Sequence, residues 1–150
     1  VPMKKLALTL LLTVPAYSAT TATLLLKGVI APVLEISCVP EAVATNLQLD
    51  QSQTNLKVAT IKERSNAHNG YKVTVQSQNG MKLKRVSGTE VIPYTLQYNN
   101  QAVNNGQQVS HNFTNASEVE RDVRISYSAA QATFPAGEYN DTITFTITAN

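Results

Sequence analysis

The chain has 150 residues, with 12 Lys and Arg against 10 Asp and Glu, and a formal net charge of +2 at neutral pH. This length suits one domain with a substantial hydrophobic core and is small for two. Two of the basic residues, Lys4 and Lys5, lie near the N-terminus, so the remaining chain is balanced in charge. It therefore offers no basic surface that would favour nucleic acid or anionic lipid as a partner.

Residues 1–18 have the pattern of a secretory signal peptide. Lys4 and Lys5 precede an apolar run over residues 6–14, and the small residues Ala16 and Ser18 follow it. We expect cleavage after Ser18, or as a second choice after Ala19, and hence export of the chain. An N-terminal anchor helix is the weaker interpretation, because the apolar run is too short to span a membrane.

Cys38 is the single cysteine of the chain, which excludes a disulfide within it. The sequence favours a buried thiol that acts as a small hydrophobic side chain. A disulfide that joins two copies of the chain is the alternative.

After residue 18 the chain alternates apolar and polar residues, which is typical of half-buried β-strands. The clearest case is the last segment, where one face is predicted to carry Tyr139, Asp141, Ile143, Phe145 and Ile147. The same alternation recurs around residues 71–75, 92–98 and 123–127. It predicts an all-β domain.

Turn residues separate these runs at the spacing expected of such a domain. They lie at residues 69–70, 79–80, 99–100, 104–106 and 135–137, and we expect several of them to form hairpins. Two layers of antiparallel strands around one core follow, so an immunoglobulin-like sandwich is the leading architecture and a closed barrel the second.

An apolar segment precedes the first strand of this domain. Read at period two, residues 22–30 place Ala22, Leu24, Leu26, Gly28 and Ile30 on one face. Pro32 removes a backbone donor and ends this strand, and a second strand resumes at residues 33–38. Pairing within its own domain is the ordinary role of such a strand. However, the most regular strand is the last one in the sequence, so we expect an uncovered edge beside it that an apolar strand of another copy could fill by strand addition.

No motif in the sequence predicts catalysis, a cofactor or a metal site. His68 and His111 are the two histidines, and we expect both at the surface because neither has metal-ligand spacing to another His or Cys. Glu118 and Glu120 share a face near Asp122, and a solvated strand start is favoured there over a calcium site. The chain is therefore expected not to be an enzyme and to have no small-molecule substrate.

Both ends of the chain resemble a known family. The stretch GVIAPVLEI and the C-terminal PAGEYNDTITFTITAN are similar to pilin subunits of the chaperone–usher pathway, including colonisation-factor fimbriae and the related spore-coat-U-type domains. The resemblance implies an immunoglobulin-like β-sandwich that lacks its final strand, with residues 19–32 as a donor strand and residues 33–150 as the pilin domain. It also implies donor-strand exchange, in which Leu24, Leu26, Gly28 and Ile30 enter a groove bordered by Tyr139, Ile143, Phe145 and Ile147.

The function implied by this resemblance is structural: a subunit of a bacterial surface fimbria, or fimbrium, that supports adhesion or biofilm formation. Its partners would be identical subunits, a periplasmic chaperone and an outer-membrane usher. The alternative is a free-standing secreted β-sandwich that serves as a binding or coat protein. A tip adhesin is less favoured, because the chain is too short for an additional binding domain.

Overall fold

The computed structural model describes residue 18 and residues 20–150. The predicted signal peptide, apart from Ser18, and the alternative cleavage position at Ala19 lie outside these described residues. The described residues divide into two units: residue 18 and residues 20–30 belong to the first, and residues 31–150 form the second.

No helix in residue 18 or residues 20–150 has both the length and the apolar character that a membrane span requires.

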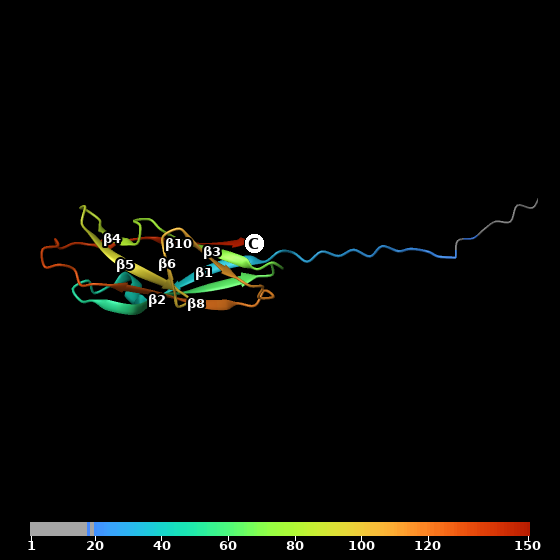
Figure 1. Cartoon of the computed structure of the whole chain (residues 1–150), viewed down its shortest axis with the longest axis horizontal. Helices are drawn as coiled ribbons and strands as arrows, with labels where there is room; N and C mark the ends of the chain where they lie inside the picture. Colours follow the sequence, from blue (N-terminus) through green and yellow to red (C-terminus); the bar gives the residue numbers. More distant parts are fainter. Residues whose placement is uncertain (1–17, 19) are drawn as a thin grey trace, which may run out of the picture. The chain divides into compact units, whose positions relative to one another are not determined.

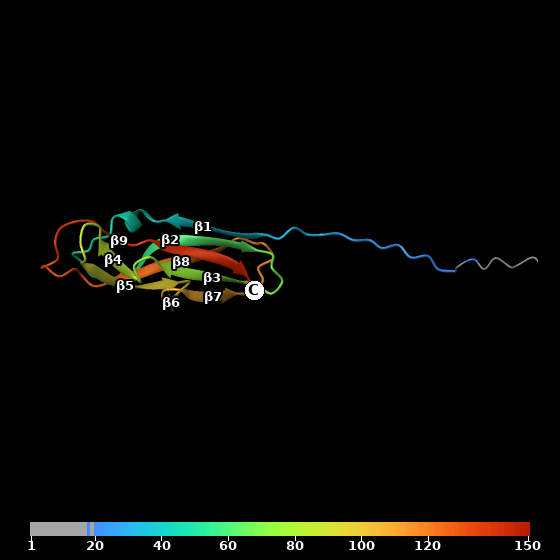
Figure 2. The same ribbon diagram turned by 90° about the horizontal axis from the view of Figure 1, so that it is seen from above.

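The regular elements of the second unit are strands, apart from one short 3-10 helix, which confirms the predicted all-β class. Its regular elements in chain order are β1 (Leu34–Pro40), the short 3-10 helix η1 (Ala42–Thr45), β2 (Gln53–Ser65), β3 (Tyr71–Ser77), β4 (Lys82–Arg85), β5 (Val91–Tyr98), β6 (Gln101–Val103), β7 (Gln107–His111), β8 (Val119–Tyr127), β9 (Tyr139–Asn140) and β10 (Ile143–Ala149). Figures 1 and 2 show most of these strands aligned along one common direction.

The strands form two antiparallel sheets, the arrangement of a β-sandwich. The larger sheet has the order β1-β2-β8-β5-β4-β9, with β6 also paired to β5, and the smaller sheet has the order β10-β3-β7. Consecutive strands β2 and β3 therefore belong to different sheets, as do β9 and β10. Within the described part of the chain, β1 and β10 each pair with one neighbour only, so each is an edge strand.

The hydrophobic core lies between the inner faces of the two sheets. Its most deeply buried apolar side chains include Ile61 on β2, Tyr71 on β3, and Leu96 and Tyr98 on β5. The alternation predicted around residues 71–75, 92–98 and 123–127 is confirmed, because every second residue in these segments is an apolar residue that is buried. Burying large side chains of this kind contributes about 1.5–3 kcal/mol each, which is the main stabilisation of such a domain.

The turns were placed correctly by the sequence, but their roles differ from the prediction. Asn99 and Asn100 both have positive φ and form the two-residue hairpin between β5 and β6, which pair at Tyr98 and Gln101. The Asn-Gly turns at residues 69–70 and 79–80 instead connect strands of different sheets. The expectation of several hairpins at these turns is therefore wrong: the glycines supply positive φ for a crossover between layers rather than for a hairpin.

Candidate functional site

The free edge of β10 carries an incompletely covered apolar face. Ile143, Phe145 and Ile147 alternate on this face and are half-buried. Their register partners on β3 are Ser77, Val75 and Val73, which are fully buried. Because side chains opposite each other on neighbouring strands point to the same face, all six belong to the inner face of the sheet. The difference in burial follows from the position of β10 at the edge.

Tyr139 does not belong to this strand, which corrects the predicted single strand over residues 139–148. Tyr139 lies in β9, which pairs with β4 in the larger sheet, and the chain changes sheets before β10 begins at Ile143. Its ring stacks on Phe134, and its hydroxyl donates to the Pro135 carbonyl at 2.9 Å. The predicted groove residue is therefore displaced from Ile143, Phe145 and Ile147 by a break in the strand.

Asp141 is the physical cause of this break. Its Oδ1 accepts hydrogen bonds from the backbone N–H groups of Asn79 at 3.0 Å and Thr142 at 2.8 Å. Its Oδ2 accepts from the hydroxyl of Tyr94 at 2.6 Å and from the hydroxyl of Ser77. Burial, together with the Asp141 carboxylate, raises the pKa of Tyr94. One carboxylate thus joins the loop after β3, the strand β5 and the start of β10.

The second edge strand, β1, also has an exposed inner face. Leu34, Ile36 and Cys38 pair with Ser65, Glu63 and Ile61 of β2, and those three partners are buried. Leu34 is nevertheless 39% exposed and Cys38 is exposed. The prediction that Cys38 is a buried thiol is therefore wrong, because the inner face of β1 lies at an edge with little above it. The partial burial that remains raises the pKa of the Cys38 thiol.

These two incompletely covered inner faces adjoin each other. The edges β1 and β10 approach to within 8 Å between Cα atoms. β1 starts and β10 ends at the same end of the domain, where residues 66–70 connect β2 to β3, so the two edges run in opposite directions. We call the apolar surface formed by Leu34, Ile36, Cys38, Ile143, Phe145 and Ile147 the edge groove.

The apolar segment at residues 20–30 has no regular secondary structure. Its expected strand over residues 22–30 is absent from the described chain, because a strand needs a partner for its backbone groups. Leu24, Leu26 and Ile30 are 80%, 83% and 89% exposed. Nothing lies within 4 Å of the position that a Cβ of Gly28 would occupy.

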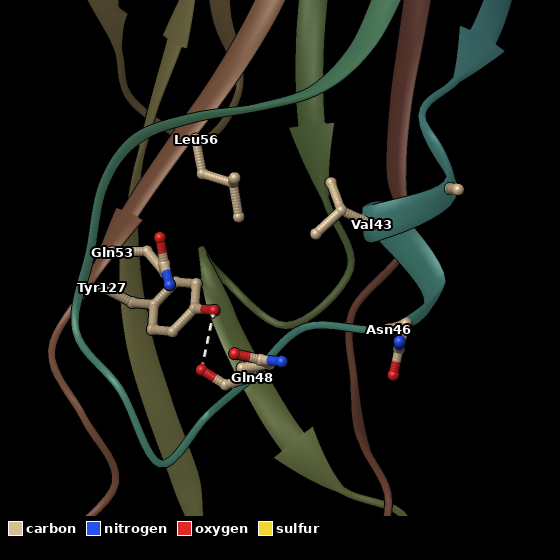
Figure 3. Close-up of a pocket in the computed structure, with 7 residues that line it drawn as sticks. Val43, Asn46, Gln48, Gln53, Leu56 and Tyr127 are labelled. Atoms are coloured by element: carbon tan, nitrogen blue, oxygen red, sulfur yellow. Dashed lines mark hydrogen bonds between the residues drawn. The ribbon is translucent and has the colours of Figure 1, made fainter.

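Two cavities lie beside residues 42–49, the segment that follows β1. The sequence patterns predicted no structure for this segment. One, of about 430 Å³, lies between η1 and the strands β2 and β8. Figure 3 shows Val43 and Leu56 pointing into it, while the Tyr127 hydroxyl donates to the Gln48 carbonyl at 3.1 Å. The other, of about 400 Å³, is lined by Leu47, Leu49 and Leu83 and reaches Tyr139.

A buried polar cluster lies between the sheets, and it corrects the prediction that His111 is a surface residue. The His111 side chain is only 8% exposed, and its Nε2 lies 3.9 Å from Oε2 of Glu63, which is fully buried. That Oε2 also accepts hydrogen bonds from the Tyr71 hydroxyl at 2.7 Å and from Arg121 Nε at 3.4 Å. His68 is exposed, as expected.

Burial moves the pKa values of this cluster in opposite directions. Burial, with a smaller effect from Arg121, lowers the pKa of His111 to about 4. Burial raises the pKa of Glu63 above its usual value and, together with the hydrogen bond to Glu63, raises the pKa of Tyr71 to about 12. Each shift disfavours the charged form of a buried group.

These shifts predict opposite pH dependences of stability for two variants. The unfolded chain binds a proton at His111 near pH 6.5 and the folded chain only near pH 4, so His111 makes the domain lose stability as pH falls through this window. The raised pKa of Glu63 has the reverse sign. His111→Gln should therefore reduce the acid loss of unfolding free energy, by up to about 3 kcal/mol, and Glu63→Gln should increase it. Urea unfolding across the same window measures both, and equal slopes in the two variants would contradict the assignment.

The carboxylates near the start of β8 pair with lysines. Lys62 Nζ lies 3.2 Å from Glu118 and 3.3 Å from Glu120, and Lys57 Nζ lies 3.0 Å from Asp122. In residue 18 and residues 20–150, no three His, Cys, Asp or Glu side chains gather closely enough to hold a metal ion. The outer face of β2 and β8 is thus a solvated, charge-paired surface.

The sequence of the chain matches none of the protein-family models and none of the curated proteins with which it was compared.

Proposed function

We propose that the protein is a structural subunit of a bacterial surface fimbria that polymerises by donor-strand exchange. The observation that carries this proposal is the edge groove, an apolar surface between two unpaired strand edges, together with the exposed apolar segment at residues 20–30. The segment has one apolar face and backbone groups without partners. The groove lies between β1 and β10, which both carry apolar side chains and have free backbone groups on their unpaired sides. Strand addition satisfies both.

The order of the strands supports an immunoglobulin-like topology that lacks one strand. In such a sandwich, four strands form one sheet in the order A-B-E-D, and the other sheet contains C, F and G. Here β1-β2-β8-β5 corresponds to A-B-E-D, and β3 and β10 correspond to C and F. The place of G is the free side of β10, which is the edge groove. We propose that the N-terminal segment of a second copy occupies this place.

The width of the groove sets a condition on insertion. Neighbouring strands of a sheet lie 4.7–4.9 Å apart, so a strand paired on both sides needs roughly 9.5 Å between its neighbours. Because the two edges approach to within 8 Å, an entering strand has to part them in places. An empty groove of this kind also exposes apolar surface, which favours association with any available strand. The proposal therefore includes a periplasmic chaperone that covers the groove and an outer-membrane usher that directs assembly at the cell surface.

A pair of substitutions in the full chain tests this proposal. Leu26 lies on the face of the segment that enters the groove, and Leu25 lies on the opposite face. Leu26→Asp should abolish polymers because a carboxylate cannot be buried there, whereas Leu25→Asp should leave them intact. Light scattering measures the polymers. A thiol reagent measures whether Cys38, which lies in the groove, is covered.

We expect Cys38 to be protected in the parent and in Leu25→Asp, and reactive in Leu26→Asp. A parent chain that stays monomeric with a reactive Cys38 would contradict the proposal. That result would favour the free-standing secreted domain.

Gly28 gives a finer prediction about the fit of the segment. Gly28 interrupts the apolar face of residues 22–30, so the groove is expected to have no room for a side chain opposite it. Gly28→Leu should slow polymer growth, because repacking around an oversized residue costs about 1–3 kcal/mol. Val29→Leu, on the opposite face, is the matched control and should grow at the parental rate. Equal growth of both variants would show that Gly28 is only a flexible position.

A further inference from the structure

Asn66 binds the backbone on both sides of Pro32. Its Nδ2 donates to the Ala31 carbonyl at 2.9 Å, and its Oδ1 accepts from the Val33 N–H at 2.7 Å. Its backbone N–H donates to the Val33 carbonyl at 3.2 Å. Because Leu34 pairs with Ser65, the contact between Val33 and Asn66 continues the ladder of β1 and β2 by one step. We call these contacts the Asn66 clamp.

The clamp lies at the point where a chain filling its own groove would have to reverse. The segment at residues 20–30 leads directly into β1, which borders the edge groove. To lie beside β1 of the same copy, the chain must turn back within residues 31–33 and form a hairpin. A wider loop that began earlier would take Ile30 and Gly28 out of the groove.

Such a hairpin within one chain forms faster, and at lower cost in free energy, than pairing with a second copy, unless the linker prevents it. A segment tethered by a short linker has an effective concentration in the millimolar range. At micromolar subunit concentrations, closure within one chain would therefore be favoured over exchange by roughly 10²–10³. Exchange between copies requires a linker that resists reversal.

The residues of the linker resist it. Hairpins with three-residue loops need a residue in the left-handed region, which is usually glycine. Pro32 is locked near φ −65°, the residue before a proline is restricted to extended backbone, and β-branched Val33 disfavours positive φ. None of residues 31–33 is among the described residues with positive φ. Reversal would also break the hydrogen bonds of the Asn66 clamp.

We propose that the Asn66 clamp and the Ala31-Pro32-Val33 linker prevent the N-terminal segment from closing onto its own groove and so direct it to a second copy. This inference rests on the proposed function. Asn66 is a positioning residue: it acts on the direction of the chain at residues 31–33 and not on the groove itself.

Three full-length chains test the inference: the parent, Pro32→Asn with Val33→Gly, and the same pair combined with Asn66→Ala. Val33→Gly supplies the left-handed residue of a three-residue loop over residues 31–33, and Pro32→Asn removes the fixed φ of the proline. This loop places Ile30 opposite Leu34 and Leu26 opposite Cys38, so the apolar face of the segment still enters the groove. Asn66→Ala removes the side-chain part of the clamp. We expect the fraction of polymer to fall in this order, by roughly tenfold or more in the triple variant. The monomers should have Cys38 protected from a thiol reagent, because their own segment fills the groove. The double variant keeps Asn66, so its comparison with the parent still tests the inference if the triple variant does not fold.

Leu26→Asp added to the double and triple variants separates this inference from the proposed function. If their monomers are self-filled, Leu26→Asp should expose Cys38. Variants that polymerise as much as the parent would overturn the role of the clamp and leave donor-strand exchange standing. Monomers of every chain with a reactive Cys38, unaffected by Leu26→Asp, would overturn both proposals.

Discussion

Moving residues 20–31 behind Asn150 through a short Gly/Ser linker, with the original segment deleted, is expected to convert the protein into a stable monomer. The transferred strand can then reach the edge groove within its own chain. Asn150 holds the end of β10 near the β2–β3 connection, since its N–H donates to the Gly70 carbonyl at 3.1 Å. The linker therefore starts at one end of the groove, and the strand can run along β10 from there.

The expected gain in melting temperature is large. Burial of Leu24, Leu26 and Ile30 contributes about 1.5–3 kcal/mol each, and ordering of the strand offsets part of this. A net gain of about 3 kcal/mol would raise the melting temperature of the grafted chain by roughly 10 °C over the simple deletion. Thermal unfolding with light scattering measures the two effects together.

A matched control identifies the source of the gain. The same graft with Leu24→Ser and Leu26→Ser keeps the length and backbone of the strand but removes most of its apolar face. It should melt close to the deletion. If the unaltered graft also melts no higher than the deletion, residues 20–31 are not the strand that fits this groove.

Asp141→Ala is expected to destabilise the domain by about 3–5 kcal/mol, the largest single loss we foresee. The substitution leaves two buried hydroxyls, those of Tyr94 and Ser77, without their acceptor, and it removes the acceptor of two backbone N–H groups. A loss of this size would lower the melting temperature by roughly 10–20 °C.

Two controls accompany this substitution. Asp141→Asn keeps one oxygen for the backbone donors, so it should lose clearly less than Asp141→Ala. Thr142→Ala changes an exposed neighbour at the same break and should stay within about 0.5 kcal/mol of the parent. Denaturant unfolding gives the three values. A loss for Asp141→Ala as small as that for Thr142→Ala would show that the carboxylate does not hold the strand break.

The sequence correctly predicted the burial pattern of strands that have a neighbouring strand on each side. Tyr71, Val73 and Val75 alternate strictly, and each is fully buried because β10 and β7 flank β3 and the larger sheet covers it. Near the C-terminus, the same alternation predicted one strand where the structure has two. Tyr139 and Ile143 are in phase along the sequence, yet they lie in different sheets, because the partners of Asp141 come from residues about 47 and 64 positions away.

Cys38 and His111 show why the site was only partly predictable. Cys38 was predicted to be buried and His111 to be exposed, because these are the usual environments of the two residue types. The observed burial depends instead on which side chains of the facing sheet cover each residue. Cys38 faces inward but lies at an edge, and His111 lies against Glu63 from another sheet. One signal was available: Glu63 follows Ile61 at period two, which places a carboxylate on an inner face and calls for polar partners there.

The topology of the smaller sheet constrains when the domain can fold. β3 is paired with β10 over the register from Tyr71 with Ala149 to Ser77 with Ile143, so its neighbour lies more than 60 residues later in the chain. Pairings between distant segments form slowly, because the intervening loop must close first. During synthesis, Val73 and Val75 remain uncovered on that side until β10 emerges. β3 therefore gains this neighbour only after β10 is free, and a chain that stops before Ile143 leaves β3 as a further unpaired sheet edge.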